Sequence, residues 1–265
     1  IDAMREIRQT GVILLIALVI LFFFAHCATN REEIDKRFQS SLNRATSYLQ
    51  IGDYINALKE LAEAQKLKPD SAELHNLMGL AYIGKKEIDK AIEHLQKAIE
   101  IDPKYTEARN NLCRAYGAAG KWDEAIKQCE IATKDILYAT PHFAYNNLGL
   151  AYYHSGQLQK AVDAFKKAIE IAPRFAPSHN NLGMVYYELG ELSIAEEELK
   201  TAVELFPEYI DAHFLLGKVY MEKGENNRAL EEFQTVQKLD QFGPFGKMAK
   251  RYVELLQKKA GKESF

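Results

Sequence analysis

Two internal cysteines are the residues of this 265-residue sequence whose spacing points most directly to chemistry. Cys113 and Cys129 enclose a loop close to the length for which a disulfide stabilises a fold by about 3 kcal/mol. In an oxidising compartment these two thiols can pair. They can equally be buried thiols that act as small apolar residues. Both interpretations stay open from the sequence.

Seven histidines are the next candidates, because imidazole serves as a general base and as a metal ligand. Three of them, His75, His179 and His213, recur at one place within similar segments, which indicates a structural role. The HExxH and GxSxG motifs, paired CxxC motifs and a phosphate-binding glycine loop are absent from the sequence. The sequence therefore predicts no catalytic residues, no metal site and no cofactor, and it favours a binding protein over an enzyme.

Asparagines at two adjacent positions of the same segments are the third set. A side-chain amide offers a donor and an acceptor together, so a row of amides can bind the backbone of an extended guest peptide. The alternative is that the amides bond neighbouring turns and hold the stack of segments together. Both alternatives stay open for the first position, which holds Asn76, Asn110, Asn146 and Asn180, whereas the second holds Asn43, Asn111, Asn147 and Asn181.

A repeated segment positions these candidates. Similar stretches such as YNNLGLAYYHSG, from Tyr145, and HNNLGMVYYELG, from His179, recur along the chain. The spacings between successive starts are 34, 34, 36, 34 and 34 residues. A period of 34 residues is the length of the tetratricopeptide repeat, which is a helix–turn–helix unit. The six copies begin at Phe38, Ala72, Thr106, His142, Ala176 and Ile210.

Small residues and glycines recur where two packed helices require them. The eighth position of four copies is glycine, and alanine fills the twentieth position of all six. These small residues let the two helices of a hairpin approach closely. Five copies place a glycine between their helices, where a left-handed backbone is inexpensive only for glycine. Those five are Gly52, Gly120, Gly156, Gly190 and Gly224.

The predicted fold is all-α, a right-handed superhelical solenoid of six tetratricopeptide helical hairpins over residues 38–243. Residues 244–260 form an amphipathic pattern that predicts a C-terminal capping helix over the last hairpin. Residues 261–265 are expected to form a loose tail.

The first thirty residues have a different pattern. Arg5 and Arg8 precede fourteen apolar residues from Val12 to Ala25, fewer than the about 20 that span a bilayer. This pattern is typical of a signal peptide. Cys27 directly after it predicts a lipoprotein signal over residues 1–26, acylation of Cys27 and a lipid-anchored linker over 27–37. The alternative is an uncleaved inner-membrane signal anchor with a periplasmic domain.

The first helix of each hairpin is expected to line a partner-binding groove. Apolar side chains at its ninth and twelfth positions exceed what a water-facing surface needs, and such surfaces usually mark interaction sites. The alternative is that they form the core between repeats. We expect the groove to receive an apolar or amphipathic segment of another protein. Its predicted residues are Leu49, Asn76, Leu80, Ile83, Asn110, Phe143, Asn146, Leu150, Tyr153, Asn180, Met184, Tyr187, Phe214 and Met221.

The joint between the third and fourth repeats carries the two extra residues of the 36-residue spacing. It reads Leu137-Tyr138 and then Thr140-Pro141. This joint, the six repeats and the lipoprotein-like start resemble the pilotins of type IV pili, which are tetratricopeptide lipoproteins that help to assemble the outer-membrane secretin. The resemblance implies that Cys27 holds the protein on the periplasmic face of the outer membrane.

The resemblance also implies a function and partners. The groove would bind a secretin protomer and promote its membrane insertion and multimerisation for type IV pilus assembly, with other pilus-machine proteins as further partners. The alternative is a periplasmic adaptor scaffold for another envelope complex, in cell-wall synthesis or polysaccharide export. A formal net charge of -3 gives no basic face for nucleic acid.

Overall fold

The computed structural model describes residues 31–263, which contain helices and turns and no strand. They divide into two compact units, 31–105 and 106–263. No helix in this part of the chain is both long enough and apolar enough to cross a bilayer. The predicted signal peptide and Cys27 lie outside the described residues. The all-helical prediction is therefore confirmed for the part of the chain that the structure describes.

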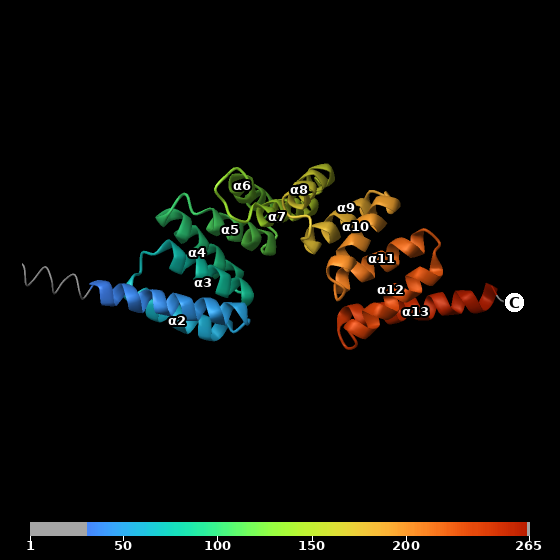
Figure 1. Ribbon diagram of the computed structural model, residues 1–265, viewed down its shortest axis with the longest axis horizontal. Helices are drawn as coiled ribbons and strands as arrows, with labels where there is room; N and C mark the ends of the chain where they lie inside the picture. Colours follow the sequence, from blue (N-terminus) through green and yellow to red (C-terminus); the bar gives the residue numbers. More distant parts are fainter. Residues whose placement is uncertain (1–30, 264–265) are drawn as a thin grey trace, which may run out of the picture. The chain divides into compact units, whose positions relative to one another are not determined.

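The first unit consists of two helical hairpins (Figure 1). A helix over residues 31–50 packs against α2 through Leu42, Leu61 and their neighbours, and α3 pairs with α4. Phe38 and Leu42 of the first helix are buried against Leu61 and Leu74, so the two hairpins share one apolar core. The labelled helices are α2 (Tyr54–Leu67), α3 (Ala72–Gly84) and α4 (Ile88–Ile101).

The second unit contains four hairpins and one further helix. Within it, α5 packs against α6, α7 against α8, α9 against α10 and α11 against α12 (Figure 1). The first helices of successive hairpins also contact each other directly, α5 with α7, α7 with α9 and α9 with α11. The helices are α5 (Thr106–Ala118), α6 (Trp122–Ala132), α7 (Pro141–His154), α8 (Leu158–Ile171), α9 (Ala176–Glu188), α10 (Leu192–Leu205), α11 (Ile210–Glu222), α12 (Asn226–Leu239) and α13 (Pro244–Glu263).

The turns between paired helices follow the glycine prediction. All five predicted glycines have positive φ angles, between 72° and 79°. The second repeat has Lys86 at the same position, and Lys86 adopts a φ of 62°. A left-handed backbone brings Cβ close to the following carbonyl oxygen, so this lysine is less favourable there than glycine.

The eighth repeat position shows why small residues recur. A Cβ added to Gly149 would lie 2.6 Å from the Phe165 ring, and one added to Gly183 would lie 2.7 Å from Leu199. Each glycine therefore lets a large side chain from the twenty-fourth position of the same repeat pass directly over the helix backbone. The prediction of close helix approach is confirmed. In the third repeat these two positions are Cys113 and Cys129.

The joint between the third and fourth repeats, which has two extra residues, keeps a hydrogen bond that is also found at a joint of normal length. Asp135 accepts hydrogen bonds from the Thr106 hydroxyl and, at 2.9 Å, from the Leu137 amide. Tyr138 then accepts a hydrogen bond of 3.2 Å from Asn110, as Tyr105 does from Asn76 in the first unit. The two extra residues therefore fit without loss of this bond. Leu137 in this joint is 87% exposed.

Both ends of the repeat array differ from the expected boundaries. Residues 31–37, inside the segment expected to be a linker, are already part of the first described helix. Glu32 and Lys36 pair one turn apart at 2.7 Å, and such charged residues favour helix. Helix α13 continues to Glu263, so the expectation of a loose tail is wrong for residues 261–263. One glycine, Gly261, costs a helix only about 1 kcal/mol and does not end it.

Candidate partner-binding face

A row of half-buried apolar side chains lies along the first helices of the second unit, and we call it the groove face. It consists of Leu150 and Tyr153 of α7, Met184 and Tyr187 of α9, and Met221 of α11. Each side chain is neither buried in the core nor fully exposed. The groove face therefore presents apolar surface to solvent, which is the feature that a protein partner requires.

Tyrosine–carboxylate bridges tie successive repeats together across the groove face. The Tyr153 hydroxyl donates to the Glu188 carboxylate, and the Tyr187 hydroxyl donates to Glu222. Burial and the bonded carboxylate together raise the pKa of Tyr153 to about 12 and raise the pKa of Tyr187 as well. The Lys218 ammonium lies 4.5 Å from the centre of the Tyr187 ring. The sequence did not predict these bridges.

The asparagines bond one another and not an open surface. Asn147 Nδ2 donates to Asn110 Oδ1 at 2.9 Å, and Asn181 Nδ2 donates to Asn146 Oδ1 at 3.0 Å. The Ser178 hydroxyl donates to the same Asn146 oxygen at 3.1 Å. Asn110 and Asn146, at the fifth repeat position, thus each accept a bond from the sixth position of the next repeat. For Asn110 and Asn146 the structure supports the stacking alternative over capture of a guest backbone.

Asn180 is the exception in this row. Its side chain is 7% exposed, and its Oδ1 is the one buried side-chain oxygen or nitrogen in the described part of the chain that has no hydrogen-bond partner. The two donors that serve Asn146 have apolar counterparts in the sixth repeat, Ala212 and Leu215. A buried acceptor without a donor costs about 1–3 kcal/mol.

A small pocket of about 250 Å³ opens beside the groove face between α5, α6 and α7. It is lined mainly by apolar atoms, and its residues include Leu150, Gly117 and Ala151. The Trp122 ring stacks on the His154 ring with 4.5 Å between centroids. Arg114, which is exposed, also lines it. We call this cavity the Trp122 pocket. Of its residues, only Leu150 was predicted from the sequence.

Other predicted groove residues serve the core. Leu49 and Leu80 pack against the apolar core of the first unit, and Asn76 is buried there. Ile83 is half-buried in α3. Phe214 is half-buried, and its ring packs against rings of α12 and α13. Its neighbours are Phe233, Phe245 and Tyr252, with centroids 5.3 to 5.8 Å away.

Phe143 stands apart from the groove face, at the start of α7. Its side chain is 41% exposed, and it packs edge-on against Phe175 with 5.2 Å between centroids. His142 completes this aromatic group. The group lies where α7 meets the end of the fourth repeat.

The recurring histidines make hydrogen bonds between helices, and this is the structural role that their regular placement predicts. His179 Nδ1 lies 2.7 Å from a Glu198 carboxylate oxygen, and Nε2 lies 2.9 Å from the Pro173 carbonyl oxygen. Because both partners are acceptors, this arrangement needs both ring nitrogens protonated. Burial lowers the pKa of His179, but the bonds to Glu198 and Pro173 outweigh burial and raise the pKa overall. His213 makes the equivalent contacts.

Cys113 and Cys129 form a disulfide in the structure, with 5.5 Å between their Cα atoms. The bond joins α5 to α6 at the two positions where the other repeats place a small residue under a large one. Both cysteines are buried. The described residues contain no group of three side chains suited to a metal ion.

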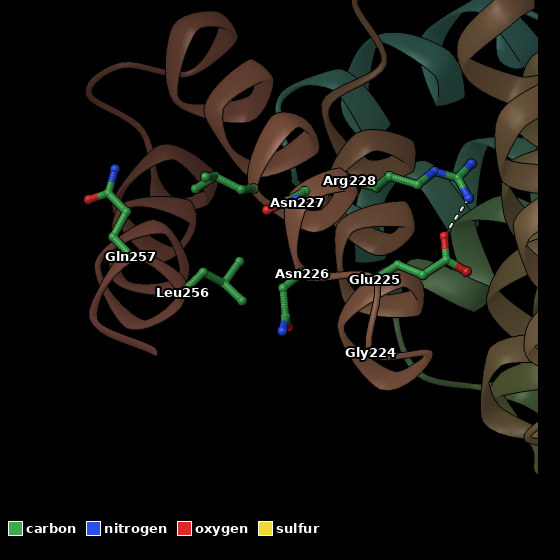
Figure 2. A pocket seen from close by; sticks show the side chains of 8 residues that line it. Gly224, Glu225, Asn226, Asn227, Arg228, Leu256 and Gln257 are labelled. Carbon is green, nitrogen blue, oxygen red and sulfur yellow. Dashed lines mark hydrogen bonds and ion pairs between the residues drawn. The ribbon is translucent and has the colours of Figure 1, made fainter. Parts of the chain in front are cut away.

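A second recess, of about 590 Å³, lies between the turn before α12 and helix α13 (Figure 2). Leu256 and Asn226 line it, and Arg228 lies on the α12 side (Figure 2). The Arg228 guanidinium already pairs with Glu225 and Glu196. Because the Arg228 charge is already matched and about half of the lining is polar, this recess is a weaker candidate than the groove face.

Family models of the tetratricopeptide repeat match the chain over residues 42–106, 82–135, 142–175, 164–197, 185–224 and 210–242. The matches that start at residues 142 and 210 begin at the starts of α7 and α11. The chain is a tetratricopeptide-repeat protein. Such repeats bind protein partners on stacked helices.

Curated relatives cover part of this repeat array. The small glutamine-rich tetratricopeptide repeat-containing protein 2 of Mycosarcoma maydis is 33% identical over 117 residues, which are 43% of this chain and 30% of that protein. The type IV pilus assembly protein PilF of Pseudomonas aeruginosa is 24% identical over 137 residues, 52% of this chain and 54% of PilF. The chain thus spans between about a third and a half of these relatives.

Two solved structures match the fold over most of the chain. The PilF structure from Pseudomonas aeruginosa aligns with a TM-score of 0.71 and 18% identity, covering 83% of this chain and 99% of PilF. The structure of PilW, described as a type IV pilus biogenesis factor, aligns with a TM-score of 0.73 and 23% identity, covering 80% and 97%. At these identities the likeness establishes a shared fold.

Proposed function

We propose that this protein is a pilotin, an outer-membrane lipoprotein that binds a secretin subunit and promotes its insertion and multimerisation for type IV pilus assembly. One observation carries the proposal: almost the whole length of PilF and of PilW has a counterpart in this fold. The relationship to the PilF sequence supports it further. Membrane attachment rests on Cys27 and the apolar segment before it.

The groove face is the part of this protein that holds the secretin subunit. Its leucine, methionines and tyrosines are half-exposed, so a partner segment that covers them removes apolar surface from water at about 25 cal/mol per Å². Methionine adapts to side chains of varied shape. Binding there requires no catalysed reaction, and the partner segment is apolar or amphipathic.

Deletion of the gene tests the proposal. We expect the deletion strain to contain secretin monomers and to lack heat-resistant secretin multimers on denaturing gels. Normal multimers in that strain would refute the proposal and would favour an adaptor scaffold for another envelope complex.

Complementation then locates the binding surface. A gene carrying Leu150→Asp and Met184→Asp should fail to restore multimers, because two carboxylates on the groove face oppose apolar capture. Ile194→Asp is the matched control, since Ile194 is 38% exposed on α10, away from the groove face. Circular dichroism shows whether each variant keeps its helices. Full restoration by the Leu150 and Met184 variant would exclude the groove face.

A further inference from the structure

The histidine that links the two helices of a hairpin has a different partner in the second repeat. In the fifth and sixth repeats, the histidine at the fourth position bonds a glutamate at the twenty-third position, as His179 bonds Glu198. In the second repeat the twenty-third position holds His94, and its Nδ1 lies 2.9 Å from Nδ1 of His75. His75 is buried and His94 is half-buried. A second base thus stands where the other two repeats place a carboxylate.

The contacts of the second repeat require a neutral His75. Its Nε2 lies 3.1 Å from the Pro69 carbonyl oxygen, so this nitrogen carries the proton and donates. Nδ1 of a neutral His75 is then an acceptor, and it needs the Nδ1–H of His94 as its donor. A proton on His75 Nδ1 would set two N–H groups against each other. Full protonation therefore breaks the bond between α3 and α4.

A proton on His94 Nε2 would keep that bond but would place a positive charge in a stack of rings. The His94 ring stacks on His75 and, with 5.3 Å between centroids, on Tyr82. The Lys90 ammonium already lies 5.4 Å from the centre of the Tyr82 ring, and it pairs with Glu87. A charged His94 would thus be half-buried beside an ammonium group, and burial of a charge without a bonded counter-charge is unfavourable.

The other charged groups around the two rings do not replace the missing carboxylate. Asp70, in the turn before α3, and Glu93 of α4 favour a positive charge on the rings, whereas Lys97 of α4 opposes it. Neither carboxylate pairs with a ring nitrogen of His75 or His94, whose printed bonds are those to Pro69 and to each other. Burial is the main cause that lowers the pKa of both histidines, and the neighbouring His75 lowers the pKa of His94 further.

The two kinds of pair therefore respond to pH with opposite sign. For His75 and His94, whose pKa values are lowered, stability is complete above the unfolded value of about 6.5 and is lost as pH falls below it. Burial opposes a charge on His179 and His213 as well, but their bonds to a glutamate and a carbonyl raise the pKa of each. Their stability is complete below about 6.5 and is lost as pH rises.

We propose that the second repeat is an acid-sensitive hairpin: protonation of the His75–His94 pair weakens the packing of α3 against α4, while the same acidification strengthens the packing of α9 against α10 and of α11 against α12. Repeats of this kind contact only their neighbours, so their stability is local. Acidification therefore shifts stability from the first unit to the second. This pH response is independent of the proposed function.

Titration of the histidines by nuclear magnetic resonance, on the full chain in detergent, tests the proposal. We expect His75 and His94 to titrate below the unfolded value of about 6.5, and His179 and His213 to titrate above it. Hydrogen exchange between about pH 8 and about pH 5 should show protection lost in α3 and α4 and gained in α9 and α10. Protection factors remove the intrinsic effect of pH on exchange.

Reciprocal exchange of the partner residue gives two matched variants. His94→Glu gives the second repeat the pair that the fifth repeat uses, and Glu198→His gives the fifth repeat the pair that the second uses. Each new pair already exists elsewhere in the chain, so both hairpins are expected to form. In His94→Glu, protection of α3 and α4 should rise as pH falls. In Glu198→His, protection of α9 and α10 should fall with pH.

Three results would overturn the inference. The first is titration of His75 and His94 above the unfolded value, and the second is unchanged or increased protection of α3 and α4 in acid. The third is an equal loss of protection in His94→Glu and in the unaltered chain, which would trace the acid response to groups outside the pair. If His94→Glu does not fold, the titration of the unaltered chain still decides.

Discussion

Supplying a donor to Asn180 should stabilise the second unit. Asn146 accepts bonds from Ser178 and Asn181, whereas the equivalent residues facing Asn180 are Ala212 and Leu215. Ala212→Ser places a hydroxyl where Ser178 places one in the preceding repeat. Both Ser178 and Ala212 are fully buried, so the substitution changes little except the added donor.

The expected gain follows from the cost of the unmade bond. A buried acceptor without a partner costs about 1–3 kcal/mol, and the new hydroxyl is itself satisfied by the bond it makes. We expect Ala212→Ser to raise the free energy of unfolding by about 1 kcal/mol. For a chain of this length that corresponds to a rise in Tm of about 2–4 °C.

Urea unfolding followed by circular dichroism measures this gain, and hydrogen exchange in α9 and α11 locates it. Ala144→Ser is the matched control, because Ala144 holds the same repeat position and its acceptor, Asn110 Oδ1, already receives a bond from Asn147. The control should gain little. If Ala212→Ser is no more stable than the unaltered chain, or gains no more than Ala144→Ser, the assignment of an unmet acceptor is wrong.

Three further features give measurable outcomes: the raised pKa of His179, the Cys113–Cys129 bond and the backbone of Lys86. The pKa of His179 is raised in the folded state, so the stability that its protonated ring contributes is complete below the unfolded pKa of about 6.5 and is lost as pH rises through the folded pKa. Urea unfolding at a series of pH values from mildly acidic to alkaline should show this loss of stability. The loss should be smaller in His179→Gln. Reducing the Cys113–Cys129 bond should lower the free energy of unfolding by about 3 kcal/mol. Replacing this pair by glycine and leucine, as in the second and fifth repeats, should recover part of that loss. Lys86→Gly should raise Tm, because it relieves a φ of 62° at a gain of up to about 1 kcal/mol.

The hairpins could be predicted from the sequence because each is a local unit. Turn glycines, small residues under large ones and helix starts are set within one repeat, so a residue such as Gly149 and its partner Phe165 are read from one 34-residue pattern. The ends were harder, because residues 31–37 and 261–263 continue helices with no repeat signal to extend.

The candidate site was predicted only in part because it depends on contacts between repeats. The sequence pattern alone could not show that Asn146 would accept a hydrogen bond from Asn181, or that the Phe245 ring of α13 would pack against Phe214. The Trp122 pocket was missed although a signal existed. Gly117 breaks the run of large residues at the twelfth position, and the single tryptophan lies five residues after it.

The unmet acceptor belongs to the joint that the sixth repeat makes, because Ala212 and Leu215 supply no donor to the repeat before them. Excision of residues 142–175 would bring Ser178 and Asn181 against Asn110 and leave Asn180 as it is. Excision of residues 176–209 would remove Asn180 and bring Ala212 and Leu215 against Asn146, so that Asn146 would become the unmet acceptor. In-frame loss of either repeat therefore keeps one unmet acceptor, which follows the sixth repeat to whichever repeat precedes it as the array shortens during evolution.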